Sequence, residues 1–230
     1  MYAVTIPPLL RWLYPNLRWQ YPADEKAIYL SFDDGPTPNV TDFVLEQLHR
    51  YHASATFFCL GRQVVRHPNL FECILAEGHA VGNHTYDHPN GWHTSLDDYI
   101  ANIAACATQV NSPLFRPPYG RISPRQIAHI RRNKALLLPC SSKEEQQSLP
   151  PQIVMWNVMC GEFAPTLSND DCLNNVFKHA REGSIVVFHD TQAAYERMSY
   201  VLPRVLKHYA ELGYAFKACP YYTLSAAGSA

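Results

Sequence analysis

Two histidines four residues apart are the residues of this chain best suited to bind a metal ion. His84 and His88 stand in the stretch 82–88, GNHTYDH, and the acidic pair Asp33-Asp34 lies upstream. Two imidazoles at this spacing can face one way on a helical turn and share a cation. A carboxylate from elsewhere would complete a set that resembles a catalytic zinc site with one open position. The pattern therefore predicts a metal-dependent hydrolase.

The acidic pair follows an apolar run, residues 27–32. Adjacent carboxylates repel each other unless a cation or a donor separates them. One of them can hold a metal while the other takes a proton from water bound there. Taken alone, the pair is equally compatible with a solvated turn whose aspartates begin a helix.

Three further polar clusters contain groups that can take part in hydrolysis. In the stretch 116–120, RPPYG, the prolines fix the backbone, so Arg116 could clamp a carboxylate and the Tyr119 amide could serve an oxyanion hole. His189 ends another apolar run, 184–188, and its ordinary pKa suits a general acid. The third cluster is 156–163, WNVMCGEF. A proline-rich turn and a structural histidine are the alternative interpretations of the first two.

The elements that must position these clusters alternate along the chain, which predicts parallel βαβ units in an α/β fold. About seven strand candidates suit a barrel. All five polar clusters follow a predicted strand, and catalytic groups of parallel barrels gather at the carboxyl ends of strands, so one shared site is expected. The predicted strands are 27–32, 55–60, 79–83, 114–116, 153–158, 184–188 and 214–216, and the main predicted helices begin near 40, 68, 95 and 198.

Composition narrows the function classes. The chain has 230 residues, 47% of them hydrophobic, and a net charge of -1, without the basic stripe of a nucleic-acid or membrane-surface binder. No apolar run reaches the roughly 18 residues of a spanning helix. The seven cysteines form no CxxC and predict free thiols; with no evident secretory signal, they suggest the cytoplasm.

Residues 1–26 are expected to pack outside the barrel and 140–151 to form an exposed loop. Histidines such as His79 are expected at the surface.

Taken together, the clusters resemble the polysaccharide deacetylase family, with its NodB homology domain (carbohydrate esterase family 4). Four of its five motifs occur in order, as FDDG at 32–35, HTYDH at 84–88, RPPYG at 116–120 and VFHD at 187–190. The resemblance runs from about residue 27 to 219. It implies an extension at 1–26, a deacetylase domain at 27–219 and a tail at 220–230.

The resemblance implies a distorted, incomplete (β/α) barrel that removes N-acetyl (or O-acetyl) groups from an acetylated amino-sugar oligo- or polysaccharide. It implies a divalent metal, zinc first, with cobalt or another transition metal as alternatives. The implied metal ligands are Asp34, His84 and His88. The resemblance also implies that Asp33 is the base and that Arg116 orients Asp33. It implies that the Tyr119 amide stabilises the oxyanion and that His189 is the acid.

The fourth motif departs from the family pattern W-x-V-D-x-x-D-W. Met159 replaces its first aspartate, Glu162 its second and Phe163 its tryptophan. The first aspartate is expected to pair with the catalytic histidine, so its loss leaves the pKa of His189 in question; Asn157 or Glu162 could compensate. Phe163 could wall the acetyl-methyl pocket. The other expected substrate contacts are Pro118, Trp156 and Val187.

Two alternatives stay open. The chain could be a related hydrolase of non-peptide C–N bonds in small amides. It could also be a catalytically impaired glycan-binding homologue, which the altered fourth motif suggests. The polymer, the acetyl position and the oligomeric state are not encoded in any pattern of this sequence.

Overall fold

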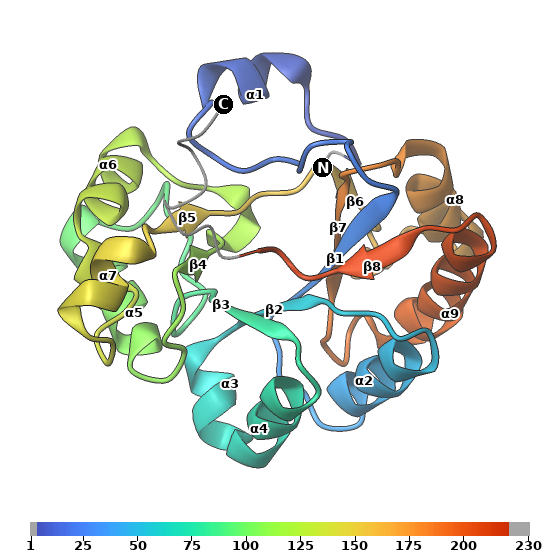
Figure 1. Cartoon of the computed structure of the whole chain (residues 1–230), viewed down its shortest axis with the longest axis horizontal. Coiled ribbons are helices and arrows are strands. Elements are labelled where there is room, and N and C mark those ends of the chain that lie inside the picture. Colours follow the sequence, from blue (N-terminus) through green and yellow to red (C-terminus); the bar gives the residue numbers. More distant parts are fainter. Residues whose placement is uncertain (1–3, 221–230) are drawn as a thin grey trace.

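The centre of the protein is a parallel sheet that curls into an incomplete barrel (Figure 1). The computed structural model describes residues 4–220. The sheet order is β5-β4-β3-β2-β1-β7-β6, and β8 pairs with the first half of β1. The predicted α/β barrel of about seven parallel strands is confirmed. Its strands are β1 (Ala27–Asp33), β2 (Thr56–Cys59), β3 (Ala80–Asn83), β4 (Leu114–Phe115), β5 (Gln152–Ile153), β6 (Val158–Met159), β7 (Ile185–His189) and β8 (Ala215–Lys217).

Strand β1 is buried along its whole length because both of its faces are covered. Ile28, Leu30 and Phe32 belong to the hydrophobic cluster beneath the outer helices. Tyr29 belongs to a second cluster, inside the barrel. Successive side chains of a strand point to opposite faces, so Asp33 falls on the interior face with Tyr29. The alternation of β1 thus places a carboxylate inside the barrel at the carboxyl end of the strand.

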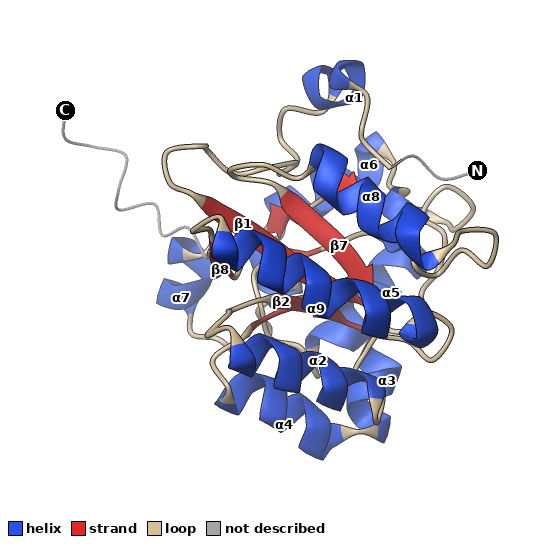
Figure 2. Ribbon diagram, turned by 90° about the vertical axis from the view of Figure 1, so that its right-hand side faces the viewer, coloured by secondary structure: helices blue, strands red, loops and turns tan. Residues whose placement is uncertain are grey.

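Helices cover the outer face of the sheet, and Figure 2 shows α2, α9 and α8 side by side across part of it. The longest, α9, packs against both α2 and α8. No helix within residues 4–220 has both the length and the apolar composition to cross a membrane. The helices are α1 (Pro8–Leu13), α2 (Val40–Arg50), α3 (Gly61–Arg66), α4 (Pro68–Ala76), α5 (Leu96–Ala107), α6 (Pro124–Arg132), α7 (Lys143–Ser148), α8 (Asn169–His179) and α9 (Tyr195–Glu211), with short 3₁₀ turns at Pro118–Gly120 and Lys134–Leu136.

The predicted strand 153–158 is wrong as a single element, because it is split into β5 and β6. The carbonyls of Val154 and Met155 accept hydrogen bonds from the buried guanidinium of Arg116, at 3.1 and 3.0 Å. The N–H of Met155 donates to the carbonyl of Arg18, at 2.7 Å, in the N-terminal segment. Because these backbone N–H and carbonyl groups bond to partners outside the sheet, strand pairing is interrupted between β5 and β6.

The N-terminal segment lies along the open side of the barrel, between the two ends of the sheet (Figure 1). Its residues make isolated bridges to Val154, Val158 and Ser184. Leu17, Trp19 and Tyr21 are buried in the interior cluster. The division of the chain at residues 26 and 219 stays a prediction, and residues 221–230 of the predicted tail lie outside the described part.

Two smaller predictions are wrong. The polar stretch 140–151 is exposed but contains α7, because Ser142 and Glu145 form a reciprocal capping box at its start. His79 is buried rather than at the surface. Its Nδ1 accepts a hydrogen bond from the N–H of Ala55 at 3.4 Å, and burial lowers the pKa of His79 to about 4. All seven cysteines are free thiols, and all but two, Cys73 and Cys140, are buried.

Candidate metal centre and active site

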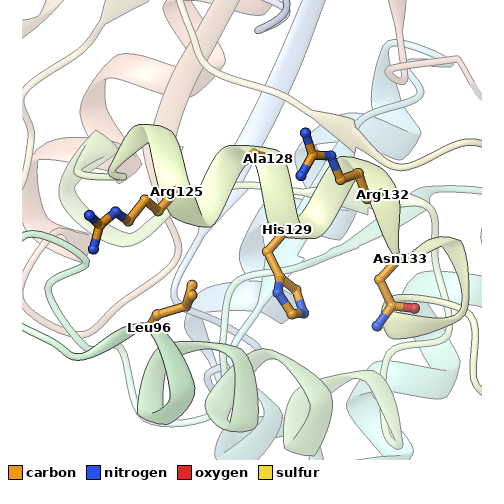
Figure 3. A pocket seen from close by; sticks show the side chains of 6 residues that line it. All are labelled: Leu96, Arg125, Ala128, His129, Arg132 and Asn133. Atoms are coloured by element: carbon orange, nitrogen blue, oxygen red, sulfur yellow. The ribbon is translucent and has the colours of Figure 1, made fainter.

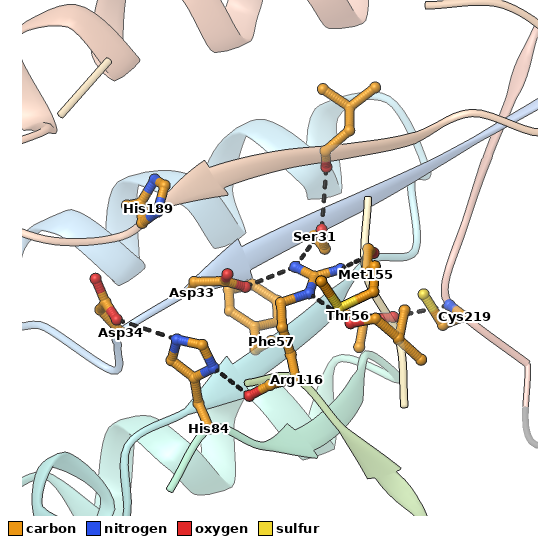
Figure 4. Close-up of polar contacts among 12 residues, drawn as sticks. Ser31, Asp33, Asp34, Thr56, Phe57, His84, Arg116, Met155, His189 and Cys219 are labelled. Carbon is orange, nitrogen blue, oxygen red and sulfur yellow. Dashed lines mark hydrogen bonds and ion pairs between the residues drawn. The ribbon is translucent and has the colours of Figure 1, made fainter. Parts of the chain in front are cut away.

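The strand register brings the predicted site residues to one edge of the sheet. Asp33, the last residue of β1, pairs with His189, the last residue of β7. On the other side of the barrel, Asn83 at the end of β3 pairs with Phe115 at the end of β4. The next residues along these two strands are His84 and Arg116. Figure 4 shows these side chains converging from separate strands on one region.

Asp34, His84 and His88 form a cluster that fits a divalent cation. The Oδ1 atom of Asp34 lies 3.1 Å from Nε2 of His88 and 3.4 Å from Nε2 of His84. His84 donates through Nδ1–H to the carbonyl of Arg116 at 2.8 Å, so its Nε2 presents a lone pair towards Asp34. Asp34 Oδ1 is buried and accepts no well-directed hydrogen bond from the described residues. Lone pairs that face one another at this range are stabilised by a proton or a metal cation between them, so the cluster can hold a cation.

The charge on Asp34 is favoured before any ion is considered. Burial works against its ionisation, but hydrogen bonds from His84 and His88 in their protonated forms outweigh burial and hold the pKa of the Asp34 carboxyl well below its usual range. All three ligand atoms lie within 4.8 Å of one another, and no other group of this kind occurs among residues 4–220. The donor set of two imidazoles and one carboxylate suits zinc and neighbouring transition metals.

The prediction that His84 and His88 share a helical turn is wrong, because they are held by a loop. Thr85 and His88 have φ values of 67° and 66°, on the left-handed side of the Ramachandran plot. Side chains fix the loop instead. Asn83 accepts from the N–H of Thr85 at 2.9 Å, and Thr85 Oγ1 accepts from the N–H of His88 at 3.1 Å. Asn102 of α5 accepts from the two amides between them.

Backbone strain is concentrated at this site. Six residues other than glycine have positive φ within the described chain. Four of them, Asp34, Thr85, His88 and Tyr119, carry or adjoin the candidate ligands. Each such conformation costs about 1–3 kcal/mol and persists only where the surrounding contacts impose it. The fold therefore forces these side chains into one arrangement in advance of binding.

Arg116 fixes Asp33 from inside the barrel. Its Nη1 donates to Oδ1 of Asp33 at 2.6 Å and to Oγ of Ser31 at 2.8 Å. The guanidinium is fully buried and lies 4.0 Å from the centre of the Phe58 ring. Together with the two carbonyl contacts between β5 and β6, these bonds use every nitrogen of the guanidinium. Asp33 is therefore held in one orientation beside the candidate metal ligands (Figure 4).

Glu162, at the second acidic position of the fourth motif, supplies a carboxylate partner for His189 in place of the missing first aspartate. Its Oε1 accepts from Nδ1 of His189 at 2.8 Å and from the His189 backbone N–H at 2.5 Å. Burial alone would lower the pKa of His189, but the charge and hydrogen bond of Glu162 raise it to about 9. Asn157, the other candidate, binds Ser184 and the N–H of Ile185 instead.

The predicted substrate contacts occupy different depths. Pro118, Trp156 and Val187 are buried, with Val187 fully enclosed in the interior cluster. Phe163 is half-buried, and its ring centre lies 4.7 Å from that of His189. Phe163 thus lies directly against His189, whereas the other three side chains are buried. Their contact with substrate stays a prediction.

Asp190 and Ser31 position the site but had no predicted role. The buried carboxylate of Asp190 accepts from the N–H of Gly35 at 3.0 Å and from Oγ1 of Thr41 at 2.5 Å. Burial raises the pKa of Asp190 to about 7. A Cβ on Gly35 would lie 2.0 Å from Asp190 Oδ2, so only glycine fits there. The available signals were an acid next to His189 and a hydroxyl two residues before Asp33 on the same strand face.

A surface pocket of about 450 Å³ lies between α5 and α6 (Figure 3). Its lining residues are Leu96, Arg125, Ala128, His129, Arg132 and Asn133. None of them belongs to the cluster at the carboxyl edge of the sheet. This pocket contains no carboxylate or second imidazole and offers no comparable chemistry.

Comparisons with known proteins agree with this geometry. Residues 20–135 match the polysaccharide deacetylase family. The chain is 33% identical over 204 residues to a peptidoglycan-N-acetylglucosamine deacetylase of Bacillus cereus, with 86% of this chain and 88% of the relative covered. The chain belongs to the polysaccharide deacetylase family.

Two further comparisons agree with this assignment. A chitooligosaccharide deacetylase of Azorhizobium caulinodans is 34% identical over 175 residues, covering 73% of this chain and 75% of the relative. A crystal structure of a peptidoglycan N-acetylglucosamine deacetylase superposes with a TM-score of 0.79 at 26% identity, covering 95% of this chain and 97% of the other. The resemblance drawn from the four motifs is therefore confirmed for the family and for the fold.

Proposed function

We propose that this polysaccharide deacetylase removes N-acetyl groups from an amino-sugar oligo- or polysaccharide in a metal-dependent hydrolysis. The observation that carries the proposal is the juxtaposition of three units at one edge of the sheet. These are the Asp34–His84–His88 cluster, the Asp33 carboxylate held by Arg116, and the His189–Glu162 pair. Each unit supplies a different requirement of amide hydrolysis.

Asp34, His84 and His88 would hold a divalent ion, zinc first and cobalt as an alternative. The chemistry that such an ion supplies is Lewis-acid polarisation and the acidification of water. Support comes from the unpartnered Asp34 Oδ1 and from the hydrogen bond that turns the His84 Nε2 lone pair towards it. The Arg116 carbonyl that orients His84 belongs to the same residue that orients Asp33, so ligand and base are set by one element.

In the proposed reaction, Asp33 accepts a proton from the attacking water as the water oxygen bonds to the acetamide carbon. The backbone N–H of Tyr119 donates to the developing oxyanion, and one such donor is worth roughly 3 kcal/mol. His189 then donates a proton to the nitrogen as the C–N bond breaks, because an unprotonated amide ion is a poor leaving group. The products are acetate and the free amino sugar.

The His189–Glu162 pair supports this assignment of the acid. The pKa of about 9 keeps His189 protonated at neutral pH, which a proton donor requires. Phe163 packs against the same ring and fits the wall of a small acyl pocket. The altered fourth motif therefore retains a carboxylate partner for the histidine, which argues against the catalytically impaired alternative.

The experiment is an acetate-release screen on protein whose metal content is measured in the same sample. We expect acetate from N-acetylated chitooligosaccharides after loading with zinc or cobalt, and little from a panel of small amides. Release from the small amides alone would favour the related C–N hydrolase. Glycan binding without acetate release, with either metal added, would favour the binding protein.

A further inference from the structure

Helix α1 carries four exposed apolar side chains on one face. Leu9 is 63% exposed, Leu10 39%, Trp12 75% and Leu13 53%. Residues at this spacing lie on the same side of a helix. Figures 1 and 2 both show α1 standing clear of the barrel. Large apolar side chains gathered in this way on a protein surface mark a place of contact with another molecule or a bilayer.

Contacts on both sides of α1 hold the helix in this position. Before the helix, Thr5 forms a bridge to β6. Arg11, on the face opposite the apolar side chains, donates through Nη1 to Oε1 of Gln20 at 2.8 Å. The indole N–H of Trp19, which is buried in the interior cluster, donates to the carbonyl of Tyr14 at the end of the helix, at 3.1 Å. The apolar face of α1 is therefore presented at a fixed place on the barrel.

Two arginines lie together beside α1 without an acidic partner. Burial and the neighbouring charge of Arg181 lower the pKa of Arg11, so the two guanidinium groups are close enough to repel each other. Neither forms a salt bridge with any residue in 4–220, not even Arg181 with Glu182, the acid that follows it. Residues 4–23 contain no acidic residue. The exposed guanidinium of Arg181 is therefore available to an anion from outside the protein.

A second pair of arginines lines a hollow near the end of α1. The hollow has a volume of about 450 Å³, and its wall includes Pro15, two residues beyond the helix. Arg18 and Arg131 are among its nine lining residues, none of which is acidic. The four arginines, at positions 11, 18, 131 and 181, come from three separate parts of the sequence, so no basic stripe appears in the chain. The fold brings them to the surroundings of one apolar helix.

We propose that the apolar face of α1 docks on the surface of an anionic lipid bilayer, with the four arginines around it facing the lipid headgroups. Leucine side chains enter the boundary between headgroups and acyl chains, and tryptophan favours the same depth. Guanidinium groups pair bidentately with phosphate oxygens. A symmetric contact between two copies of this chain would place the same cations against one another, which disfavours a second copy as the occupant. Docking uses none of the candidate metal ligands, so the inference is independent of the proposed function.

The test is co-sedimentation of the full chain with two kinds of vesicle, one of phosphatidylcholine alone and one of equal parts phosphatidylcholine and phosphatidylglycerol. Wild type should bind the anionic vesicles at least about tenfold more tightly than the neutral ones, because each basic side chain near an anionic surface adds about fivefold in affinity. The double variant Trp12→Ser/Leu13→Ser should bind the anionic vesicles about tenfold or more weakly, because less apolar surface leaves water. Arg181→Gln should weaken binding to the anionic vesicles about fivefold and leave binding to the neutral ones unchanged.

Two variants are the matched controls. Trp92→Ser removes a tryptophan that is 63% exposed but lies outside α1. Arg125→Gln removes an exposed arginine of α6 that lines the separate hollow between α5 and α6. Both controls should bind the two kinds of vesicle as wild type does. Thermal unfolding should be unchanged in every variant, because the replaced side chains are exposed, and this shows that a loss of binding is not a loss of fold.

Three outcomes would overturn the inference. The first is a wild-type protein that binds neither kind of vesicle, or binds both equally. The second is a double variant, Trp12→Ser/Leu13→Ser, that binds the anionic vesicles as tightly as Trp92→Ser does. The third is a wild-type dimer in sedimentation velocity that the double variant converts to a monomer, which would assign the apolar face of α1 to a second copy of the chain. None of these measurements depends on acetate release, so failure of the proposed function would leave this test intact.

Discussion

Replacing Glu162 with glutamine is expected to lower the pH above which turnover fails. Glutamine keeps the size of the side chain and an oxygen acceptor but removes the charge that raises the pKa of His189 from 6.5 to about 9. Burial is then opposed only by the charges of Asp34 and Asp33, and the pKa of His189 falls towards its ordinary value of 6.5. Because His189 must carry its proton to donate it, the alkaline limb of kcat moves to lower pH.

The size of the effect follows from these two pKa values. A pKa of about 9 leaves roughly 90% of His189 protonated at pH 8, whereas a pKa of 6.5 leaves roughly 3%. We therefore expect kcat of Glu162→Gln to fall roughly 30-fold at pH 8, which corresponds to about 2 kcal/mol of barrier. At pH 6 the loss from protonation shrinks to less than about twofold.

The assay is acetate release at saturating N-acetylated oligosaccharide, from about pH 5.5 to about pH 9.5, with equal zinc loading confirmed. Glu182→Gln is the control, since Glu182 is exposed and its loss changes the net charge equally. Superimposable alkaline limbs for Glu162→Gln and wild type would refute the role of Glu162 in setting the pKa of the acid. An equal loss at every pH would mean that Glu162 acts only by orientation.

Three other perturbations have expected outcomes. His84→Ala removes a candidate ligand and should lose stoichiometric zinc, measured by plasma mass spectrometry after dialysis. Gly35→Ala places a Cβ 2.0 Å from Asp190 Oδ2, and thermal unfolding should show a loss of about 1–3 kcal/mol from this overlap. Arg116→Met strands the buried carboxylate of Asp33, and denaturant unfolding should show a loss of roughly 3–5 kcal/mol.

Each of these perturbations has a contrary result. Full zinc occupancy in His84→Ala would remove that residue from the ligand set. Wild-type stability of Gly35→Ala would mean that the Asp190 contact is not tight in solution. If Arg116→Met unfolds at the wild-type denaturant concentration, the guanidinium does not stabilise the buried carboxylate. His49→Ala, at an exposed position of α2, is the control for the histidine variant.

The sequence correctly predicted which residues come together at the site, but it did not predict the local backbone conformation that holds them there. Asp33 and His189 each end an apolar run, and parallel strands bring such ends together, so their proximity follows from pattern alone. The conformation at His88 did not follow, because left-handed φ values at residues other than glycine depend on tertiary contacts such as those of Asn102. The break between β5 and β6 also depends on a tertiary contact and so could not be predicted. It is formed with the guanidinium of Arg116, which is distant in sequence.

The fourth motif shows how a substitution can be compensated nearby. Met159 occupies the position where the family commonly has an aspartate, and no carboxylate remains there. Glu162 reaches His189 from the loop after β6 and restores a charged partner. The sequence identifies Glu162 and Asn157 as candidate partners of His189. Only the fold distinguishes them, because Asn157 forms its hydrogen bonds with Ser184 and Ile185.

The most direct test of the central claim is acetate release by Asp33→Asn, with zinc content measured in the same sample. Asparagine removes the proton acceptor but leaves Asp34, His84 and His88 in place. We predict one zinc per chain and no measurable acetate from an N-acetylated oligosaccharide that wild type hydrolyses. Acetate release near the wild-type rate from zinc-loaded Asp33→Asn would contradict the assignment of Asp33 as the base and with it the proposed mechanism.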